Sequence, residues 1–218
     1  MNREIRRAAF EQVDIYPVTC SRLSAGRTDL EVLEAVIRGG AGIIQLREKE
    51  CSRKELYHLA VKFRELTAKA GILLIINDHV DIALSVEADG VHLGQDDLPL
   101  PAARKLAPQL IIGASTHSLE EALKAQAEGA DYINIGPIFP TKTKEGIDHF
   151  LGPEAITQIG SRVEIPFTAM GGITESNIDQ VLARGARRVA MVTAITQAPD
   201  IAGTVRSLKE KIRGRGNG

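Results

Sequence analysis

The chain has 218 residues, 44% of them hydrophobic, and a formal net charge of -1 at pH 7. This length and apolar content suffice for one large core, which excludes a disordered or fibrous chain. A net charge near zero excludes broad attraction to nucleic acid, so any basic site must be local.

Two further features indicate where the protein works. The only cysteines, Cys20 and Cys51, lack metal-ligand or redox spacing and are read as unpaired thiols, which fits a reducing, cytoplasmic environment. Residues 1–10 lack the apolar stretch of a signal peptide. The longest aliphatic run, Ile72 to Ile76, is far shorter than a membrane span, so we expect no membrane partner.

Short β-rich runs alternate with amphipathic segments along the chain. The segment Asn2–Gln12 is expected to form a helix, and residues 214–218 a frayed tail. Strands are predicted at Ile15–Thr19, Gly42–Leu46, Leu73–Ile76, Gly90–Leu93, Leu110–Gly113, Tyr132–Ile135, Ile165–Ala169 and Arg188–Val192. The clearest helical patterns are Ser52–Lys69, Leu119–Glu128, Asn177–Arg184 and Pro199–Ile212.

Local signals support this alternation of strands and helices. Ser52 followed by Glu55, and Ser118 followed by Glu121, are capping-box signatures for helix starts. Glycine and alanine recur where a helix ends and a strand begins, at residues 40, 88, 129 and 185. Eight strands with eight crossovers predict a single-domain (β/α)₈ TIM barrel over residues 1–218, with residues 2–12 closing its floor. An open doubly wound sheet is the alternative, but the first strand lacks a Gly-x-Gly-x-x-Gly fingerprint.

Polar or glycine-rich clusters follow the predicted strands two through eight. Active sites of such barrels are built from the loops at the carboxyl ends of the strands. The convergence of all of them at one rim therefore indicates an active site more strongly than any one cluster does. The clusters are Gln45 to Lys49, Asn77-Asp78, Gln95-Asp96-Asp97, Ser115, Thr141 to Lys144, Gly171-Gly172 and Val192-Thr193.

Two of these clusters are cationic. Because side chains alternate along a strand, Gln45, Arg47 and Lys49 should point to one side while Leu46 and Glu48 point to the other. The loop Gly136–Lys144 presents two hydroxyls and two ammonium groups between Thr141 and Lys144, a combination that suits phosphate oxygens. Solvated charged turns would have a similar composition.

The last two strands are followed by a second type of anion site. Gly171-Gly172 and Val192-Thr193 stand where phosphate-binding barrels present backbone N–H groups to a phosphate. The alternative for the glycine pair is a tight turn before a helix capped by Thr174 or Ser176.

Carboxylates at neighbouring rim positions suggest a metal. Mg²⁺ prefers one or two carboxylates together with waters and phosphate oxygens, and Asp78 and Asp97 fit that preference. Both residues are also favoured helix caps, and on residue type alone Asp96 could replace Asp97. Two anion sites and a metal suggest a reaction in which a diphosphate leaves one substrate. A second, monophosphorylated substrate would then capture the carbocation that remains. We expect His92 to be an interior residue, and His117 to lie near the rim, where it could titrate.

The combination of motifs resembles the thiamine-phosphate synthase family. The matching segments run in order from about residue 14 to 197 and are Gln45–Lys49, Asn77-Asp78, residues 88–97, Gly136–Lys144 and Gly171–Ile173. The resemblance implies a (β/α)₈ barrel, a Mg²⁺ cofactor and a transferase of thiamine biosynthesis. Such an enzyme joins 4-amino-5-hydroxymethyl-2-methylpyrimidine diphosphate to a thiazole phosphate, with loss of CO₂ from a carboxylated thiazole.

The resemblance also assigns roles. The diphosphate substrate is assigned to Gln45, Arg47, Lys49, Asn77, Ser115 and Lys144, of which Arg47, Lys49, Ser115 and Lys144 are expected to be catalytic. The metal is assigned to Asp78 and Asp97 rather than Asp96. The thiazole phosphate is assigned to Thr141, Thr143, Gly172, Val192 and Thr193. The expected partners are these two small phosphorylated substrates, with no nucleic acid. A homodimer is an expected assembly, although the residues do not determine it.

Two other functions compete with this interpretation. A thiazole tautomerase on the same barrel resembles the Pro-Thr-x-x-Lys segment and has a rim histidine that matches His117, but looks to lack the segment with Gln95 and Asp97. A catalytically silent sensor of a phosphorylated ligand is the alternative from a different class. Intact donors and carboxylates argue against both.

Overall fold

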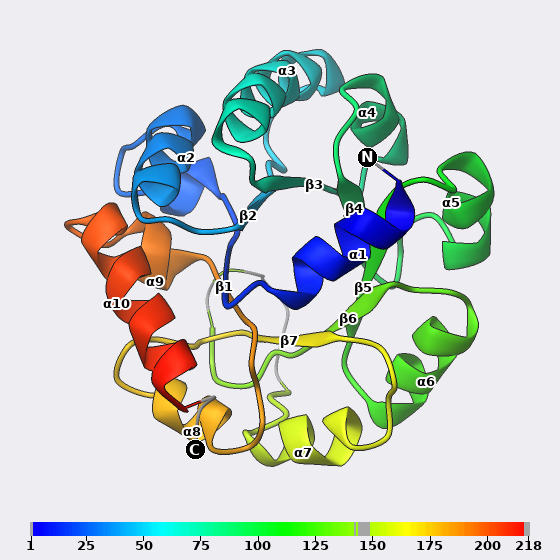
Figure 1. Cartoon of the computed structure of the whole chain (residues 1–218), viewed down its shortest axis with the longest axis vertical. Coiled ribbons are helices and arrows are strands. Elements are labelled where there is room, and N and C mark those ends of the chain that lie inside the picture. Colours follow the sequence, from blue (N-terminus) through cyan, green and yellow to red (C-terminus); the bar gives the residue numbers. More distant parts are fainter. Residues whose placement is uncertain (1, 142, 144–148, 216–218) are drawn as a thin grey trace.

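Eight parallel strands form a barrel in the computed structural model, which describes residues 2–141, 143 and 149–215 (Figure 1). The strands are β1 Ile15–Pro17, β2 Ile43–Leu46, β3 Leu73–Asn77, β4 Gly90–Leu93, β5 Ile111–Thr116, β6 Tyr132–Ile135, β7 Phe167–Met170 and β8 Val189–Met191. Their order is sequential around the sheet, with β8 paired to β1.

The sheet closes on itself between its first two strands. Val18, just beyond β1, forms a parallel bridge with Gln45 of β2, and the Thr19 N–H donates to the Gln45 carbonyl at 2.9 Å. The predicted (β/α)₈ barrel is therefore confirmed, and the open doubly wound sheet is wrong.

Helices form an outer ring around the strands, except for α1 Arg3–Glu11, which crosses one end of the barrel (Figure 1). The other helices are α2 Asp29–Arg38, α3 Arg53–Ala70, α4 Val80–Ser85, α5 Leu100–Leu106, α6 Leu119–Ala127, α7 Glu154–Gly160, α8 Ile178–Leu182, α9 Thr193–Thr196 and α10 Ile201–Arg215, with a short 3₁₀ helix at Ser21–Leu23. Helix α10 continues to Arg215, so residues 214 and 215 of the expected tail are helical, and residues 216–218 lie outside the described residues.

Several boundary predictions differ from the structure next to the site: β3 includes Asn77, β8 ends before Val192, and the largest difference is at β5. Strand β5 extends to Thr116, whereas the sequence analysis ended it at Gly113, so Ser115 lies inside the strand and not after it. Ser115 pairs with Asn134 of β6 and faces the barrel interior because it alternates with Ala114 and Thr116.

Helix caps explain several helix starts. The predicted capping box of α3 is complete, and α2 has an unpredicted one formed by Thr28 and Glu31. The Ser118 box is only half formed. Its hydroxyl accepts from the Glu121 N–H, but the Glu121 carboxylate accepts from the His117 N–H at 2.7 Å, one residue further back than predicted.

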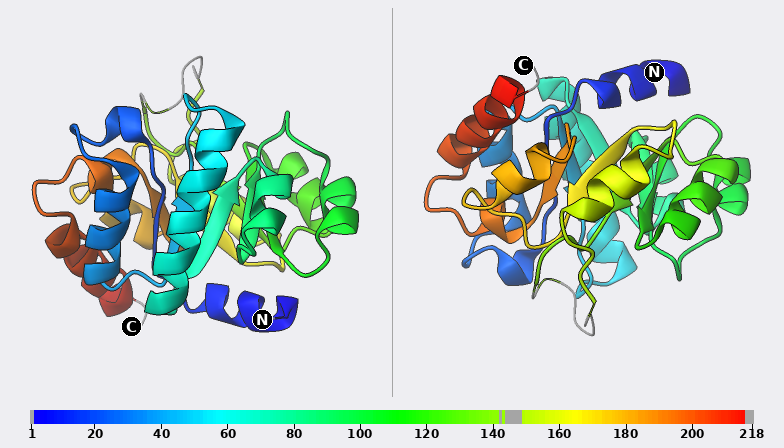
Figure 2. Two further views of the ribbon diagram at one scale, coloured as in Figure 1. Left: turned by 90° about the horizontal axis from the view of Figure 1, so that it is seen from above. Right: turned by 90° about the horizontal axis from the view of Figure 1, so that it is seen from below.

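The apolar core has two parts. One lies between the strands and the outer helices, and the other lies inside the barrel, from the floor helix up to the cavity. The inner part is built around Phe10 of α1, whose ring stacks on that of Tyr132 with a centroid separation of 4.1 Å. Helix α1 thus closes the barrel floor, as predicted, on the side opposite the carboxyl ends of the strands (Figure 2).

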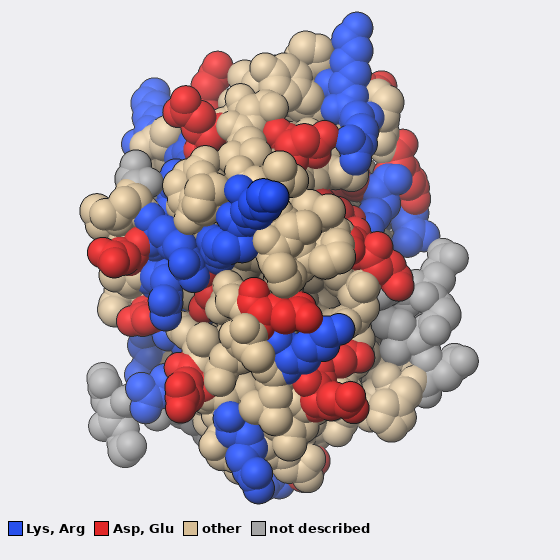
Figure 3. All heavy atoms as spheres, turned by 90° about the vertical axis from the view of Figure 1, so that its right-hand side faces the viewer, with Lys and Arg blue, Asp and Glu red and all other residues tan. Residues whose placement is uncertain are grey.

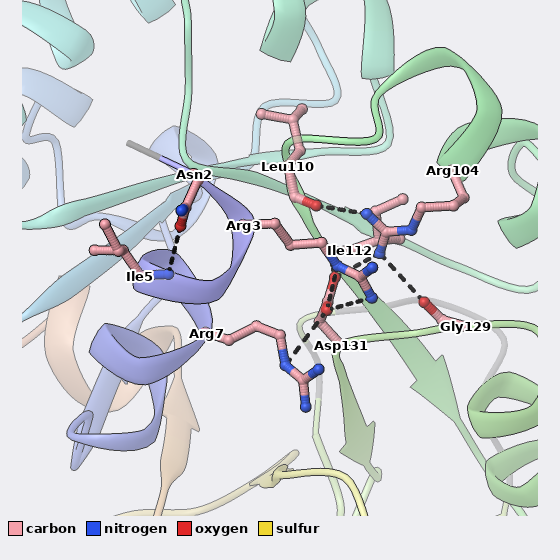
Figure 4. Close-up of polar contacts among 9 residues, drawn as sticks. All are labelled: Asn2, Arg3, Ile5, Arg7, Arg104, Leu110, Ile112, Gly129 and Asp131. Carbon is pink, nitrogen blue, oxygen red and sulfur yellow. Dashed lines mark hydrogen bonds and ion pairs between the residues drawn. The ribbon is translucent and has the colours of Figure 1, made fainter.

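Buried aspartates attach this floor helix to the barrel. Asp131, directly before β6, accepts hydrogen bonds from the Ile112 N–H at 2.9 Å and from Arg3 and Arg104 at 2.8 and 2.5 Å, with Arg7 at 3.6 Å (Figure 4). Asp89, directly before β4, is held in the same way by Arg6 of α1 and by Arg64. Charged groups at the floor are therefore paired within the protein.

The outer surface carries intermixed charges. On the side drawn in Figure 3, Lys and Arg side chains lie next to Asp and Glu rather than forming a continuous area of one sign, as the near-zero net charge leads one to expect. Within the part of the chain that the structure describes, no helix combines the length and the apolar character needed to cross a membrane.

The Asp131 cluster generates a stability prediction. Asp131→Asn should lower the free energy of unfolding by about 1–3 kcal/mol, because it removes a buried carboxylate that is paired with Arg104 and with the partly exposed Arg3 and Arg7. Urea unfolding followed by circular dichroism measures the change. The matched control Glu34→Gln removes an exposed pair with Arg38 and should change stability by less than ~0.5 kcal/mol. Equal effects for the two variants would contradict the assignment.

Candidate active site

The carboxyl ends of the strands surround a cavity of about 620 Å³. Every predicted site residue that the structure describes lines this cavity: Gln45, Arg47, Lys49, Asn77, Asp78, Asp97, Ser115, Thr141, Thr143, Gly172, Val192 and Thr193. Lys144 lies outside the described residues, so its predicted place is not tested. The convergence predicted from seven separate strand ends is confirmed for the rest.

The β2 segment points its side chains as the alternation predicts. Arg47 and Lys49 line the cavity, and the Arg47 N–H donates to Thr19 Oγ1 at 3.0 Å. Glu48 turns the other way, where its carboxylate accepts from the N–H and the hydroxyl of Ser21 at 2.7 and 2.6 Å. These bonds tie the loop after β2 to the loop after β1 and so orient the two cations on either side of Glu48.

Glu48 also lies against a buried carboxyl that the sequence analysis did not select. Asp29 begins α2 and is buried. Burial, and then the negative charge of Glu48, raise the pKa of Asp29 to about 7. The hydrogen bond between Asp29 and Glu48 joins the start of α2 to the loop after β2.

A carboxylate pair lies at the ends of β3 and β4. Asp78 adopts a left-handed backbone conformation (φ 64°), which is uncommon for a residue other than glycine, and its carboxylate contacts Lys49 Nζ at 2.5 Å. Burial, and then the neighbouring Asp78 carboxyl, raise the pKa of Asp97. Two carboxyls this close repel each other when both are ionised, which a cation between them would relieve.

The structure also distinguishes Asp97 from Asp96. Asp97 Oδ2 accepts from the Gly94 N–H at 2.6 Å, which closes the turn after β4 and directs the carboxyl toward Asp78. Asp96 is exposed. Neither Asp78 nor Asp97 is the N-cap of a helix, so the capping alternative is wrong for both.

The metal-binding capacity of this pair is limited to two protein ligands. Among the described residues, no group of three or more His, Cys, Asp and Glu side chains could hold a metal ion. Two carboxylates fit Mg²⁺, which commonly keeps several waters and binds through substrate phosphates. A more complete protein cage, as for structural zinc, is not present in the described part of the chain.

The loop after β7 is shaped by its glycines. Gly172 has φ 62°, and a Cβ there would lie 2.4 Å from the Pro140 carbonyl oxygen, so a side chain is sterically excluded. Asn177 supports the loop by donating to the Gly172 carbonyl at 2.9 Å. The alternative of a cap by Thr174 or Ser176 is wrong, because Asn177 is the N-cap of α8 and those two hydroxyls bond each other.

Hydroxyl groups and helix N–H groups complete this side of the cavity. Val192 is the N-cap of α9, whose first N–H groups have no acceptor within the helix, and Thr193 is its first residue. On the neighbouring loop after β6, the Thr141 hydroxyl accepts from the N–H of Thr143 at 3.2 Å, and the two hydroxyls lie 3.1 Å apart. The arrangement offers neutral donors to an anion.

A hydrogen-bonded chain crosses the barrel interior at the bottom of the cavity, and all its members except Tyr132 line that cavity. Gln45 Nε2 donates to the Tyr16 hydroxyl at 2.9 Å, which lies 2.9 Å from the Tyr132 hydroxyl. The Tyr132 hydroxyl lies 3.1 Å from His92 Nδ1, and His92 Nε2 lies 3.0 Å from Ser115 Oγ. We call these five residues the interior relay.

The members of the interior relay are neutral. Burial lowers the pKa of His92 to about 4 and raises the pKa values of Tyr16 and Tyr132. The expectation that His92 is a hydrogen-bonded interior residue is confirmed. The sequence analysis did not select the two tyrosines, although strand alternation places Tyr16 with Val18, and Tyr132 with Asn134, on the inner face.

His117 lies at the rim, as predicted, and is held at two points. Its N–H donates to Glu121 at 2.7 Å, and its Nδ1 lies 2.5 Å from the Gly136 carbonyl, which requires a proton on Nδ1. These two contacts hold the His117 ring in the cavity wall.

Comparisons with known proteins agree with this site. Residues 15–195 match the protein family described as thiamine monophosphate synthase. The chain is 47% identical to a thiamine-phosphate synthase from Pelotomaculum thermopropionicum, over 91% of each chain, and 42% identical to one from Dictyoglomus turgidum, over 100% of this chain and 98% of that one. A solved thiamine phosphate pyrophosphorylase from Pyrococcus furiosus has a TM-score of 0.87 at 36% identity, covering 97% of this chain and 98% of that one.

The Asp29–Glu48 pair generates a prediction about pH. Native Asp29 keeps its proton up to about pH 7, whereas the unfolded chain releases it near ~3.9. The contribution of Asp29 to stability is therefore present below about pH 4 and is lost as the pH rises through about 7. Urea unfolding at pH 5 and pH 8 should show that Asp29→Asn loses less stability over this range than the unsubstituted protein. The exposed control Glu34→Gln should lose as much stability between pH 5 and pH 8 as the unsubstituted protein does. The same result for Asp29→Asn would refute the pKa assignment.

Proposed function

The chain belongs to the thiamine monophosphate synthase family, and we propose that it joins 4-amino-5-hydroxymethyl-2-methylpyrimidine diphosphate to a thiazole phosphate. The products would be thiamine phosphate and diphosphate, with CO₂ lost in addition from a carboxylated thiazole. One observation carries the proposal. One cavity is lined by two cations and by Asp78, Asp96 and Asp97 on one side and by the glycine and hydroxyl loops on the other, which suits two phosphorylated substrates held side by side.

The cationic side suits the departing diphosphate. The bond between the pyrimidine methylene carbon and the diphosphate oxygen breaks, and both electrons leave with that oxygen. Arg47 and Lys49 provide positive charge where the leaving group becomes more negative, which is the electrostatic form of catalysis. The aminopyrimidine ring delocalises the positive charge that remains on the carbon. Lys144, outside the described residues, is proposed for the same side.

A divalent cation fits the carboxylate pair. Asp78 and Asp97 would hold Mg²⁺, because their neighbouring carboxyls form a donor set that suits it and leave coordination positions for phosphate oxygens and water. When bound, the ion would neutralise charge on the diphosphate. Lys49 contacts Asp78 in this structure and would contact the diphosphate instead.

The opposite wall suits the thiazole phosphate. Gly172 allows the backbone to approach a phosphate closely, and Thr193 together with the first turn of α9 offers N–H and hydroxyl donors. Thr141 and Thr143 add hydroxyls from the loop after β6. A phosphate held here places the thiazole in the cavity, where its nitrogen lone pair forms the new bond to the methylene carbon.

The rival functions leave part of the site without a role. A thiazole tautomerase needs neither the Asp78–Asp97 pair nor the cations Arg47 and Lys49, and these residues line one cavity together. A silent sensor would not need a strained Asp78 backbone beside a second carboxyl. A cytoplasmic location and a homodimer remain predictions from the sequence.

The direct experiment uses the purified protein with both substrates and MgCl₂. Liquid chromatography with mass spectrometry should detect thiamine phosphate, and a coupled assay should detect an equal amount of diphosphate. Each substrate is also incubated alone as a control. Formation of neither product, with a correctly folded protein, would exclude the proposed reaction.

Loss of one cation should slow the bond-breaking step. Arg47→Ala or Lys49→Ala should lower kcat by about 10²–10³-fold, the effect of removing one preorganised group that stabilises developing negative charge. Single-turnover measurements at saturating substrates separate this loss from weaker binding. The exposed lysine of α3, in Lys54→Ala, controls for the change of net charge. Full turnover in either site variant would remove that residue from the proposed mechanism.

The two neighbouring aspartates allow a matched test of the metal site. Asp97→Asn should raise the Mg²⁺ concentration needed for half-maximal activity by at least about tenfold, because only one carboxylate would remain for the ion. Asp96→Asn makes the same chemical change one position earlier and should leave this requirement nearly unchanged. Titration of activity with MgCl₂ measures both. The reverse order would transfer the metal role to Asp96.

A further inference from the structure

The interior relay has a direction, and the amide of Gln45 determines it. Gln45 points Nε2 at Tyr16, so the amide donates and the Tyr16 oxygen accepts at that bond. Tyr16 must then use its own proton toward Tyr132, and Tyr132 must use its proton toward His92 Nδ1. A hydroxyl oxygen can accept two hydrogen bonds, but among the described residues the Tyr16 proton has no acceptor other than Tyr132, which leaves His92 Nδ1 as the acceptor for the Tyr132 proton.

The same reasoning determines the tautomer of His92. Its Nδ1 accepts from Tyr132, and a neutral imidazole then carries its proton on Nε2. Nε2 lies 3.0 Å from Ser115 Oγ, so the imidazole donates to the serine oxygen. The proton of Ser115 is not needed by the relay and is available to a ligand.

The two ends of the relay therefore present opposite polarities to the cavity. Gln45 uses one N–H of its amide on Tyr16, and its Oε1 has no hydrogen-bond donor among the described residues. Ser115 has accepted from His92 and keeps a donor. Both side chains line the cavity, so a ligand meets one acceptor and one donor.

We propose that Tyr16, Tyr132 and His92 are positioning residues that select an amino-substituted ring over its oxo counterpart, by holding Gln45 as an acceptor and Ser115 as a donor. The proposal rests on the proposed function, because it concerns recognition of the pyrimidine in that reaction. An aminopyrimidine offers an exocyclic N–H donor for Gln45 and an unprotonated ring nitrogen for Ser115. The corresponding oxopyrimidine offers a carbonyl and a ring N–H, which is the reverse pattern.

Packing holds the centre of the relay in place. The Tyr132 ring stacks on Phe10 from below. On its other side, a Cβ at Gly113 would lie 2.1 Å from the Tyr132 ring, so only glycine leaves room for the ring there. Tyr16 and Tyr132 are 1% and 0% exposed. Water therefore does not take the place of one of their hydrogen-bond partners, which could reverse the direction of the relay.

The test compares binding of two non-reacting ligands. They are the amino and oxo pyrimidines that carry a methylene bisphosphonate in place of the diphosphate, with affinities measured by isothermal titration calorimetry in MgCl₂. The unsubstituted protein should prefer the amino compound. In Tyr16→Phe the Gln45 amide can rotate, because its acceptor is gone. In Tyr132→Phe the proton of His92 can be on either ring nitrogen, because no hydroxyl donates to Nδ1. Each should reduce the preference about tenfold, the value of one well-made buried hydrogen bond.

The control is Tyr57→Phe, which removes the hydroxyl of an exposed tyrosine on α3 and should preserve the preference. Thermal melts establish that the variants are folded. An amino preference that is unchanged in Tyr16→Phe and Tyr132→Phe would overturn the proposal. The catalytic assay is independent of this result. Absence of thiamine phosphate with the unsubstituted protein would reject the proposed function, whereas normal synthesis with an unchanged preference would reject only the relay.

A second measurement needs no substitution. In protein labelled with ¹⁵N-histidine, the resonance assigned to His92 should show a protonated Nε2 and an unprotonated Nδ1. A proton on Nδ1 would reverse the two bonds that His92 makes, to Tyr132 and to Ser115, and would contradict the proposal even if a tyrosine variant failed to fold.

Discussion

The parallel closure of the sheet is the constraint on which the rest of the molecule depends. Parallel strands that return to their starting point have all their carboxyl ends on one rim, so residues far apart in sequence meet there. Alternation then assigns each strand residue either to the interior or to the outer helices. Gln45 and Ser115 face inward on β2 and β5 for this reason, whereas the apolar residues next to them in each strand pack against the outer helices.

The carboxylates at the two ends of the barrel differ in how completely they are paired. At the floor, Asp131 and Asp89 are almost fully buried, and each is bonded both to a backbone N–H and to arginines, so their charge is satisfied within the protein. At the rim, Asp78 and Asp97 lie side by side with a single lysine contact. Buried charge that is fully paired contributes to the structure, whereas charge that is partly paired and open to a cavity is available to a ligand.

Prediction from sequence succeeded where the signal is local and failed where it depends on closure. The bounds of β4 and β6 agree with the structure, because glycine or alanine precedes a short apolar run at both. Ser115 was placed after β5, since the polar run from Ser115 looks like a loop until β6 pairs with it. Tyr16 and Tyr132 were missed because a tyrosine in a strand looks like ordinary core. Only the closed barrel brings their hydroxyls together, and only then is the absence of a side chain at Gly113 explained.

The contact between Lys49 and Asp78 has a consequence for the proposed reaction. Each group satisfies the other at 2.5 Å in this structure, so neither is fully available to the diphosphate or to a metal ion. Asp97, whose carboxyl is already disfavoured as an anion by burial and by Asp78, gains little from Lys49. If Asp78 turns to a divalent cation, Lys49 loses its partner at the same moment that a polyanion offers a better one. Binding of the metal ion by Asp78 and binding of the diphosphate by Lys49 would therefore favour each other. Each ligand should bind more tightly when the other is present.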